Sequence, residues 1–116
     1  MNRIYETFED EKAIYLVLEY CEGGDMFDRV IKTGRFTEMQ VATMFEMIFR
    51  IFCYMWEEEL VHRDVKPENF MFLEPYLPVE RSTIKLIDFG FARPAGEGEL
   101  MNTKSGTPYY VSPQVC

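Results

Sequence analysis

Apolar and polar residues alternate in short runs near the start of the chain, and this pattern predicts a β-hairpin. Residues 4–8 and 13–19 are rich in β-branched and aromatic side chains, and the polar sequence EDEK lies between them. The run AIYLVLEY is almost entirely apolar, which is typical of a strand that is buried on both faces. We therefore expect two paired strands, of which the second lies in the core.

The central part of the chain has the periodicity of α-helices. After the pair Gly23-Gly24, the sequence DMFDRVIKTG predicts a short helix that ends at Gly34. Thr37, with Gln40 three residues later, forms a capping box that begins a longer helix. This helix is expected to reach about residue 59, a length of roughly 33 Å at 1.5 Å per residue. Its predicted core stripe consists of Val41, Met44, Phe45, Ile48, Phe52 and Met55.

Two further strands are expected after this helix, at residues 70–73 and 84–87. The polar sequence EPYLPVERST, which contains two Pro residues, joins them. From residue 91 to residue 105 the chain is Gly-rich and polar, so this segment cannot bury much surface. The polar stretch VHRDVKPENFMF stands between the long helix and these strands, with apolar segments on both sides.

Composition places the chain among globular proteins. Its 116 residues are the length of one domain, and contents of 47% apolar and 16% aromatic residues argue against disorder. No run is long and apolar enough to span a bilayer, and the N-terminal sequence MNRIYETFEDEK lacks the features of a secretory signal. Cys21, Cys53 and Cys116 are an odd, scattered set, which favours free thiols in a reducing, cytoplasmic compartment and disfavours a zinc site. The net charge of −8 argues against nucleic-acid binding and favours cationic partners.

The polar stretch contains residue types that can bind a cation and a polyphosphate. Asp64, Lys66 and Asn69 lie within six residues, and Asp88 follows the last predicted strand. Asp and Asn oxygens suit Mg²⁺, Lys neutralises phosphate charge, and a remaining Asp could accept a proton from an attacking hydroxyl. The alternative is a solvated loop whose charges pair with one another, as most surface charges do.

The order of these residues resembles the signature of protein kinases. The motif HRDxKxxN spans residues 62–69 and the motif DFG spans residues 88–90. VHRDVKPENF and GTPYYVSPQV are similar to serine/threonine kinases of the calcium/calmodulin-dependent group. YETFEDEKAIYLVLEYCEGG, ENFMFL and PYYVSPQV together resemble the calcium-dependent protein kinases of plants and protists. The resemblance covers the whole chain and implies an α+β, protein-kinase-like fold.

The resemblance implies roles in phosphoryl transfer for the charged residues. Asp64 would be the catalytic base for the acceptor hydroxyl, and Lys66 would contact the γ-phosphate as charge is transferred. Asn69 and Asp88 would hold the Mg²⁺ ions that bridge the phosphates of ATP. His62 would be a packing residue.

The sequence LEYCEGGD resembles the hinge of a kinase, which binds the adenosine part of ATP. Leu18 would be the gatekeeper, and Glu19 and Cys21 would offer backbone groups to adenine. Asp25 would bind the ribose, and Met71 would form the apolar floor beneath the base.

Further residues are assigned to the nucleotide and substrate sites by the same resemblance. Glu68 belongs to the nucleotide site, and with Asp25 it would face basic residues that precede the acceptor Ser or Thr of a protein substrate. Thr103 and Thr107 lie in the activation loop. Thr103 matches the family's phosphorylation site, with Arg63 as its basic partner.

The chain also departs from the family pattern. No Gly-rich phosphate loop and no VAIK-like lysine strand is present, and the sequence stops before the large helices of the second lobe. Gln114 stands where many kinases have the Glu of A-P-E. We therefore expect a partial kinase domain. Residues 1–19 would be the last small-lobe strands, residues 20–24 the hinge, and residues 25–116 the start of the large lobe with the catalytic loop and activation segment.

Two functions remain open. The first is ATP-dependent phosphoryl transfer to Ser or Thr of protein substrates, with ATP and Mg²⁺ as cofactors and calcium-sensing domains outside this segment as further partners. The second is a non-catalytic, kinase-like module that binds proteins. Such modules usually lose at least one of the residues that correspond to Asp64, Lys66, Asn69 and Asp88. All four are present here, which favours the enzyme. The 116 residues alone are not expected to catalyse transfer.

Overall fold

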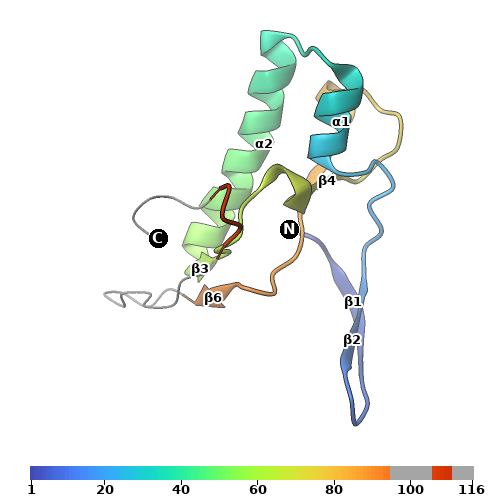
Figure 1. Ribbon diagram of the computed structural model, residues 1–116, viewed down its shortest axis with the longest axis vertical. Coiled ribbons are helices and arrows are strands. Elements are labelled where there is room, and N and C mark those ends of the chain that lie inside the picture. The colour runs from blue at the N-terminus through green and yellow to red at the C-terminus, as the bar shows by residue number, and fades with distance from the viewer. Residues whose placement is uncertain (95–105, 111–116) are drawn as a thin grey trace.

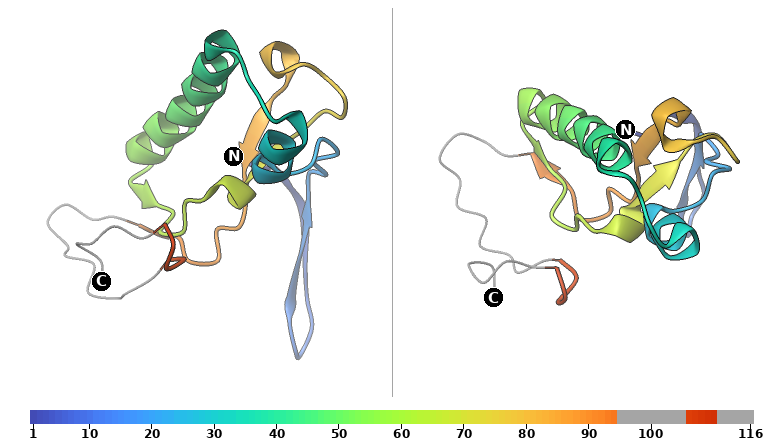
Figure 2. Two further views of the ribbon diagram at one scale, coloured as in Figure 1. Left: turned by 45° about the horizontal axis from the view of Figure 1, so that its top comes forward. Right: turned by 90° about the horizontal axis from the view of Figure 1, so that it is seen from above.

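The computed structural model describes residues 1–94 and 106–110 and has an α+β architecture (Figure 1). Strands β1 (Ile4–Glu9) and β2 (Ile14–Leu18) form a hairpin that projects away from the helices. The remaining body contains helices α1 (Met26–Thr33) and α2 (Glu38–Glu57) and a second hairpin of β4 (Phe70–Phe72) and β5 (Ile84–Leu86). Figure 2 shows from two further directions that the first hairpin lies apart from α2.

The first hairpin confirms the predicted pairing of β1 with β2. The strands pair antiparallel, and at the turn the Asp10 carboxylate accepts hydrogen bonds from the Lys12 and Ala13 N–H groups, both at 2.8 Å. The expected burial of β2 is wrong, because all five of its residues are exposed. The physical reason is that, within the described residues, β1 is its only strand partner and no helix packs substantially on either face.

Helix α1 has the predicted start and stop. The Asp25 side chain caps it by accepting a hydrogen bond from the Asp28 N–H at 2.8 Å. At the other end Gly34 has φ 71°, and its N–H donates to the Val30 carbonyl at 3.0 Å. A left-handed backbone at the end of a helix favours glycine, because in other residues the Cβ comes too close to the residue's own peptide backbone at positive φ.

Helix α2 begins at the predicted capping box and packs one stripe into the core. The Thr37 side chain accepts from the Gln40 N–H at 3.2 Å, and the Gln40 side chain accepts from the Thr37 N–H at 3.1 Å. The buried stripe consists of Met44, Ile48, Ile51 and Met55. Val41 and Phe45, which were expected in this stripe, are 37% and 51% exposed. Phe45 is turned about 100° round the axis from Met44, away from β4 and β5.

Helix α2 ends two residues earlier than expected, at Glu57. Glu59 has φ 50°, which breaks the helical backbone, and the two-residue strand β3 (Leu60–Val61) follows. This strand pairs antiparallel with β6 (Arg93–Pro94). Neither strand is long enough to show a pattern of alternation, so neither could be predicted from the sequence.

The core lies between α2 and the β4–β5 hairpin. Phe72 and Leu86 are fully buried, and Phe70, Ile84 and Val79 are 3–4% exposed. The ring of Phe70 packs edge-on against Phe52 of α2, with ring centroids 6.3 Å apart. The two predicted strands are thus confirmed, and their register pairs Phe70 with Leu86.

The loop between β4 and β5 is closed where its two ends meet. The Glu74 carboxylate accepts hydrogen bonds from the Thr83 N–H at 2.8 Å and from the Thr83 hydroxyl at 2.9 Å. Between these residues a 3₁₀ turn, η2 (Val79–Arg81), places Val79 in the core. The tip of the loop carries Tyr76, which is 99% exposed and has φ 59°.

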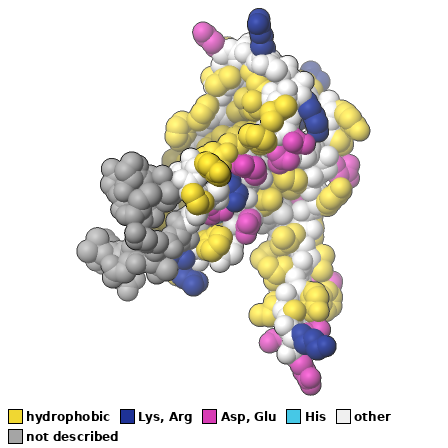
Figure 3. All heavy atoms as spheres, in the orientation of Figure 1, with side chains coloured by type: hydrophobic (Ala, Val, Ile, Leu, Met, Phe, Trp, Pro, Cys, Tyr) yellow, Lys and Arg dark blue, Asp and Glu magenta, His cyan; other side chains and the backbone are white. Residues whose placement is uncertain are grey.

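Hydrophobic side chains remain exposed over much of the described surface. Figure 3 shows them along the β1–β2 hairpin and over the helical part of the same face. On α2, Phe49 and Trp56 are 59% and 85% exposed. None of the helices in the described part combines the length and the hydrophobicity that crossing a bilayer requires.

Candidate active site

The β4–β5 hairpin brings two polar segments together at one of its ends. Beyond the pair of Phe70 and Leu86, the Ile87 N–H donates a hydrogen bond to the Asn69 carbonyl at 2.9 Å. The polar segment before β4 therefore lies beside the segment that follows β5. Since one register fixes both, Asn69 and Asp88 lie at the same end of the hairpin.

Asp64, Lys66 and Thr107 form a hydrogen-bonded triad at this end. The Lys66 Nζ donates to Asp64 Oδ2 at 2.7 Å and to Thr107 Oγ1 at 3.0 Å. The Thr107 hydroxyl donates to Asp64 Oδ1 at 2.6 Å. The Asp64 side chain is 4% exposed and that of Lys66 is 21% exposed. Each Asp64 oxygen has a donor within the triad and keeps lone-pair capacity for a further one.

The triad holds Asp64 in its ionised form. The hydrogen bond from Lys66, and next that from Thr107, lower the pKa of Asp64 below its usual value of 3.8. The same bond to Asp64 raises the pKa of Lys66, so the amine stays cationic. A carboxylate of low pKa is a weak base. It orients a hydroxyl through a hydrogen bond and takes the proton only when that oxygen becomes acidic.

Asn69 and Asp88 provide oxygen atoms that fit a magnesium ion. The Asn69 Nδ2 donates to the Asp64 carbonyl at 2.8 Å, which leaves Asn69 Oδ1 without a donor among the described residues. Asp88 is exposed, has φ 59°, and accepts a 3.3 Å hydrogen bond from the Gly90 N–H. Across residues 1–94 and 106–110, no three His, Cys, Asp or Glu side chains gather round one point. An amide and a carboxylate suit Mg²⁺, which takes its other ligands from phosphates and water.

His62 is a packing residue, as expected, and it also joins the two segments. It is 1% exposed, and its ring packs edge-on against Phe89 at 4.9 Å between centroids. The Asp64 N–H donates to His62 Nδ1 at 3.3 Å, so the opposite nitrogen, Nε2, donates to the Ile87 carbonyl at 3.0 Å. A single ring therefore fixes Asp64 relative to the end of β5.

Arg63 contacts the backbone that follows β5. It has φ 68°, and its Nε donates to the Phe91 carbonyl at 2.6 Å. The phosphorylation site predicted at Thr103 lies outside the described residues, as do Cys116 and Gln114, so the pairing of Arg63 with Thr103 stays a prediction.

Residues 22–25 run alongside β4 and form backbone hydrogen bonds with it, as an edge strand would. The backbone bonds are Glu22 N–H to the Leu73 carbonyl at 3.1 Å, Gly23 N–H to the Phe72 carbonyl at 2.9 Å, and Phe72 N–H to the Gly24 carbonyl at 2.8 Å. Asp25 and Met71 form an isolated antiparallel bridge beyond them. The approach is so close that a Cβ on Gly23 would lie 2.5 Å from the Phe72 Cβ.

The residues predicted to bind adenine lie on either side of this edge. Leu18 ends β2 and is 44% exposed, while Cys21 is 7% exposed. Met71 is half-buried on β4. The Glu19 N–H donates to the Arg3 carbonyl at 2.8 Å. Burial raises the pKa of the Cys21 thiol, so the sulfur stays protonated and is not a reactive thiolate.

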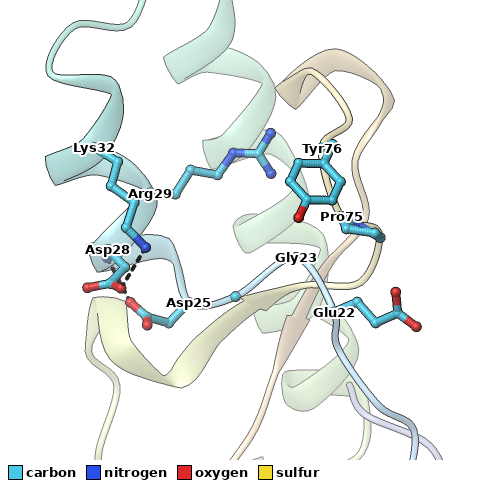
Figure 4. Close-up of a pocket in the computed structure, with 9 residues that line it drawn as sticks. Glu22, Gly23, Asp25, Asp28, Arg29, Lys32, Pro75 and Tyr76 are labelled. Carbon is cyan, nitrogen blue, oxygen red and sulfur yellow. Dashed lines mark hydrogen bonds and ion pairs between the residues drawn. The ribbon is translucent and has the colours of Figure 1, made fainter.

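A polar pocket of about 280 Å³ lies next to this edge, between α1 and the loop after β4 (Figure 4). Its charged side chains largely bind protein groups. The Asp25 carboxylate caps α1, Lys32 pairs with Asp28 at 3.1 Å, and Arg29 donates to the Leu77 carbonyl while its guanidinium lies 4.1 Å from the centre of the Phe72 ring. The pocket is lined by Glu22, Gly23, Gly24, Asp25, Asp28, Arg29, Lys32, Pro75 and Tyr76. None of these belongs to the triad, whereas Asp25 is also one of the residues predicted to bind the nucleotide.

Comparison with known proteins identifies the family. The whole chain, residues 1–116, matches the family model of the protein kinase domain. The chain belongs to the protein kinase domain family. Its α+β fold is that of a protein kinase domain, and the HRD and DFG motifs stand at the two strand ends described above.

Relatives of this kinase-domain chain are calcium-dependent protein kinases. It is 46% identical over 114 residues to calcium-dependent protein kinase 3 of Plasmodium yoelii yoelii, covering 97% of this chain and 21% of the relative. It is 41% identical over 110 residues to calcium-dependent protein kinase 14 of Arabidopsis thaliana, covering 95% of this chain and 20% of the relative. The chain thus spans about a fifth of the length of these relatives.

Contacts made by two residues at the candidate active site had not been predicted. Thr107 was assigned only to the activation loop, whereas it binds both Asp64 and Lys66. Tyr110, two residues after Pro108, donates from its hydroxyl to Glu68 Oε1 at 3.3 Å. Because 41 residues separate Lys66 from Thr107, no local spacing in the sequence could indicate these contacts.

Proposed function

We propose that the full-length protein carrying this chain is an ATP- and Mg²⁺-dependent protein kinase that phosphorylates Ser or Thr residues of protein substrates. The observation that carries this proposal is the Asp64–Lys66–Thr107 triad beside Asn69 and Asp88. An ionised carboxylate, an ammonium and two unclaimed oxygens are the groups that phosphoryl transfer requires. Membership of the protein kinase family supports the same reaction.

The division of the chain follows from this proposal. Residues 1–19 are the last strands of the small lobe, residues 20–24 are the hinge, and residues 25–116 are the start of the large lobe. Antiparallel pairing in 1–19 and the backbone bonds of 22–24 with β4 support these limits.

Adenosine binds at the hinge in this proposal. Glu19 and Cys21 supply backbone groups to adenine, Leu18 is the gatekeeper, Asp25 faces the ribose, and Met71 lies beneath the base. The bridge between Asp25 and Met71 supports this assignment, because it places both residues at one point on β4.

Asp64 and Lys66 act on the acceptor hydroxyl and the transferred phosphoryl group. The hydroxyl of the substrate donates a hydrogen bond to a remaining lone pair of Asp64, which directs the oxygen at the γ-phosphorus. As the new O–P bond forms and the bond to ADP breaks, the proton passes to Asp64. The Lys66 ammonium neutralises the negative charge of the phosphoryl group. Asn69 and Asp88 would hold Mg²⁺, which supplies charge neutralisation along the polyphosphate when bound.

Substitution of the catalytic base tests the reaction. In the full-length protein, Asp64→Asn should reduce kcat by at least about 1,000-fold, because Asn neither accepts the proton nor orients the hydroxyl as an anion does. Nucleotide affinity should be retained in Asp64→Asn and lost in Asp88→Asn, which removes a carboxylate ligand of Mg²⁺. A kcat for Asp64→Asn within a few-fold of wild type would show that the roles are wrong. It would leave a non-catalytic, protein-binding module as the function.

Protein substrates with basic residues before the acceptor fit the acidic site. Glu68 is held by Tyr110, and the Glu68 Oε2 is buried without a hydrogen-bond partner among the described residues, which suits a cationic side chain. A peptide array should show preference for Arg or Lys before the Ser or Thr, and the preference should weaken in Glu68→Gln. An array with acidic preference would overturn the substrate assignment.

We further propose that calcium-sensing domains outside this segment regulate the activity. Phosphorylation of the preferred peptide by the full-length protein should therefore respond to calcium.

A further inference from the structure

One ion pair joins the hinge to the strand that leads to Asp88. The Lys85 Nζ lies 3.0 Å from Glu19 Oε2, and the two side chains are 20% and 18% exposed. The approach is not aligned as a hydrogen bond, so the contact is an ion pair held mainly by charge. Two other ion pairs of the described residues, Lys32–Asp28 and Arg50–Glu46, join neighbours on one helix and are 57–77% exposed.

This ion pair attaches one end of the hinge to β5, and backbone hydrogen bonds attach the other end to β4. Lys85 stands directly opposite Met71 in the β4–β5 register, and Met71 bridges to Asp25. Residues 22–24 bind the backbone of 72–73. The hinge is thus fixed to one hairpin twice, at Glu19 through a side chain and at 22–25 through the backbone.

Unclaimed backbone groups lie between these two attachments. Cys21 is buried, and its N–H and carbonyl bind no backbone partner within the part of the chain that the structure describes. The Glu19 carbonyl accepts one hydrogen bond, from Asn2 Nδ2 at 3.1 Å, and keeps a second lone pair. Buried backbone groups without partners are rare in folded proteins, so a ligand is expected to bind them.

We propose that Glu19 and Lys85 are a positioning pair for the nucleotide base. The pair sets the distance between the hinge backbone and the Met71 floor, so that adenine fits between them. It acts through charge, because the attraction between the ammonium and the carboxylate holds the hinge and β5 at a fixed separation, which two neutral side chains would not maintain. The inference rests on the proposed function. It adds that an ion pair between side chains positions the hinge backbone, which recognition of adenine by the backbone alone does not include.

The test uses charge removal and charge exchange in the full-length protein. The variants are Glu19→Gln, Lys85→Gln, the double neutral variant, and the exchange Glu19→Lys with Lys85→Glu. The dissociation constant of adenosine, which has no phosphates, is measured by calorimetry, and KM for ATP and kcat are measured in parallel. Each single variant and the double neutral variant should weaken adenosine binding about three- to tenfold, the worth of about one hydrogen bond. KM should rise more than kcat falls, and the exchange should restore most of the affinity.

A purely structural role for the pair gives a different result. The double neutral variant has no unpaired charge, so it should then bind adenosine like wild type even if its melting temperature changes. Wild-type affinity in the double neutral variant, or no recovery in the exchange, overturns the proposal even if the single variants do not fold. Glu46→Gln with Arg50→Gln is the matched control, since that exposed pair on α2 should leave adenosine binding unchanged. A wild-type protein that binds no adenosine would instead refute the proposed function itself.

Discussion

Thr107 is placed so that one hydroxyl serves two charged groups. It accepts a hydrogen bond from the Lys66 ammonium and donates its own proton to the Asp64 carboxylate. The bond between Lys66 and Asp64 closes the triangle, and all three distances are 2.6–3.0 Å. Removal of the hydroxyl therefore affects the orientation of the carboxylate as well as its charge.

Thr107→Val removes the hydroxyl and keeps the shape of the side chain. Hydrogen bonds to charged groups contribute more than neutral ones, so kcat/KM for the protein substrate should fall about 10- to 100-fold. KM for ATP should change little, because the hydrogen bonds of the Thr107 hydroxyl go to Asp64 and Lys66. Thr107→Ser is the matched control, since it keeps the hydroxyl. Equal loss in both variants would mean that packing of the methyl group, and not the hydroxyl, is what matters.

Thr107→Val should also alter the dependence of kcat/KM on pH. The pKa of Asp64 is lowered by Lys66 and Thr107, so the carboxylate stays ionised to a lower pH than an ordinary Asp. Its contribution to stability is complete above about pH 4 and is lost as the pH falls through the lower pKa of the folded state. In Thr107→Val the pKa of Asp64 should rise. The acidic limb of the kcat/KM profile should then move to higher pH, and a limb that stays in place would contradict this account.

Charged residues close together in the sequence could be grouped without a structure. Asp64, Lys66 and Asn69 lie on one loop, and their chemistry pointed to a phosphate site before any fold was known. Thr107 and Tyr110 could not be assigned to the same site. Their contacts depend on how a distant segment folds back, and a single Thr or Tyr in a loop carries no signal of that kind.

The hinge runs very close to β4 at Gly23. A Cβ on Gly23 would come within 2.5 Å of the Glu74 carbonyl and the Phe72 Cβ. Gly23→Ala should therefore push the hinge away from β4 and lower the free energy of unfolding by about 1–3 kcal/mol. KM for ATP should rise, because the same displacement moves the backbone of Cys21. Chemical unfolding of the full-length protein measures the first effect and steady-state kinetics the second.

Gly34→Ala is the control for this prediction. Gly34 has φ 71°, and a Cβ there would meet no atom within 4 Å. The substitution should cost only the strain of a left-handed Ala, about 1–2 kcal/mol, and should leave KM for ATP unchanged. An unchanged KM in Gly23→Ala would show that the hinge tolerates the displacement.

Helices could be predicted closely because their signals are local. Thr37 and Gln40 cap α2 through bonds between near neighbours, and Gly34 ends α1 through its own backbone. Burial of β2 could not be predicted, since it depends on what packs against the strand. An apolar run shows only that a strand can be buried. Whether the strand is buried depends on the elements that pack against it.

The projecting hairpin makes the chain less compact than its length suggests. The radius of gyration is 15.9 Å, whereas a compact domain of about 100 residues has about 13 Å. Exposed apolar surface runs along both strands of the hairpin and along α2. Folded domains are stable by only about 5–15 kcal/mol, which leaves little allowance for uncovered apolar faces.

The 116 residues expressed alone should therefore associate and show negligible phosphoryl transfer. Light scattering should detect oligomers, because among the described residues the hairpin offers an unpaired edge and apolar faces. ATP turnover should stay at background, because the sequence contains no Gly-rich phosphate loop and no VAIK-like lysine. Ile14→Lys, at a position that is 68% exposed, should reduce association without restoring turnover. A monomeric chain with measurable ATP turnover would refute this prediction.

The two hydrogen bonds from Thr83 to the Glu74 carboxylate separate the tip of the β4–β5 loop from the strands. Lengthening a closed loop raises its entropic cost only with the logarithm of its length, and exposed tips are where insertions are tolerated. Val79 and the Leu77 carbonyl are held by the core and by Arg29, so this freedom is confined to the neighbourhood of Tyr76. Homologous loops can thus vary in length at that point, and a fluorophore or affinity tag can be attached there. The register that places Asn69 and Asp88 at the same end of the hairpin is then preserved.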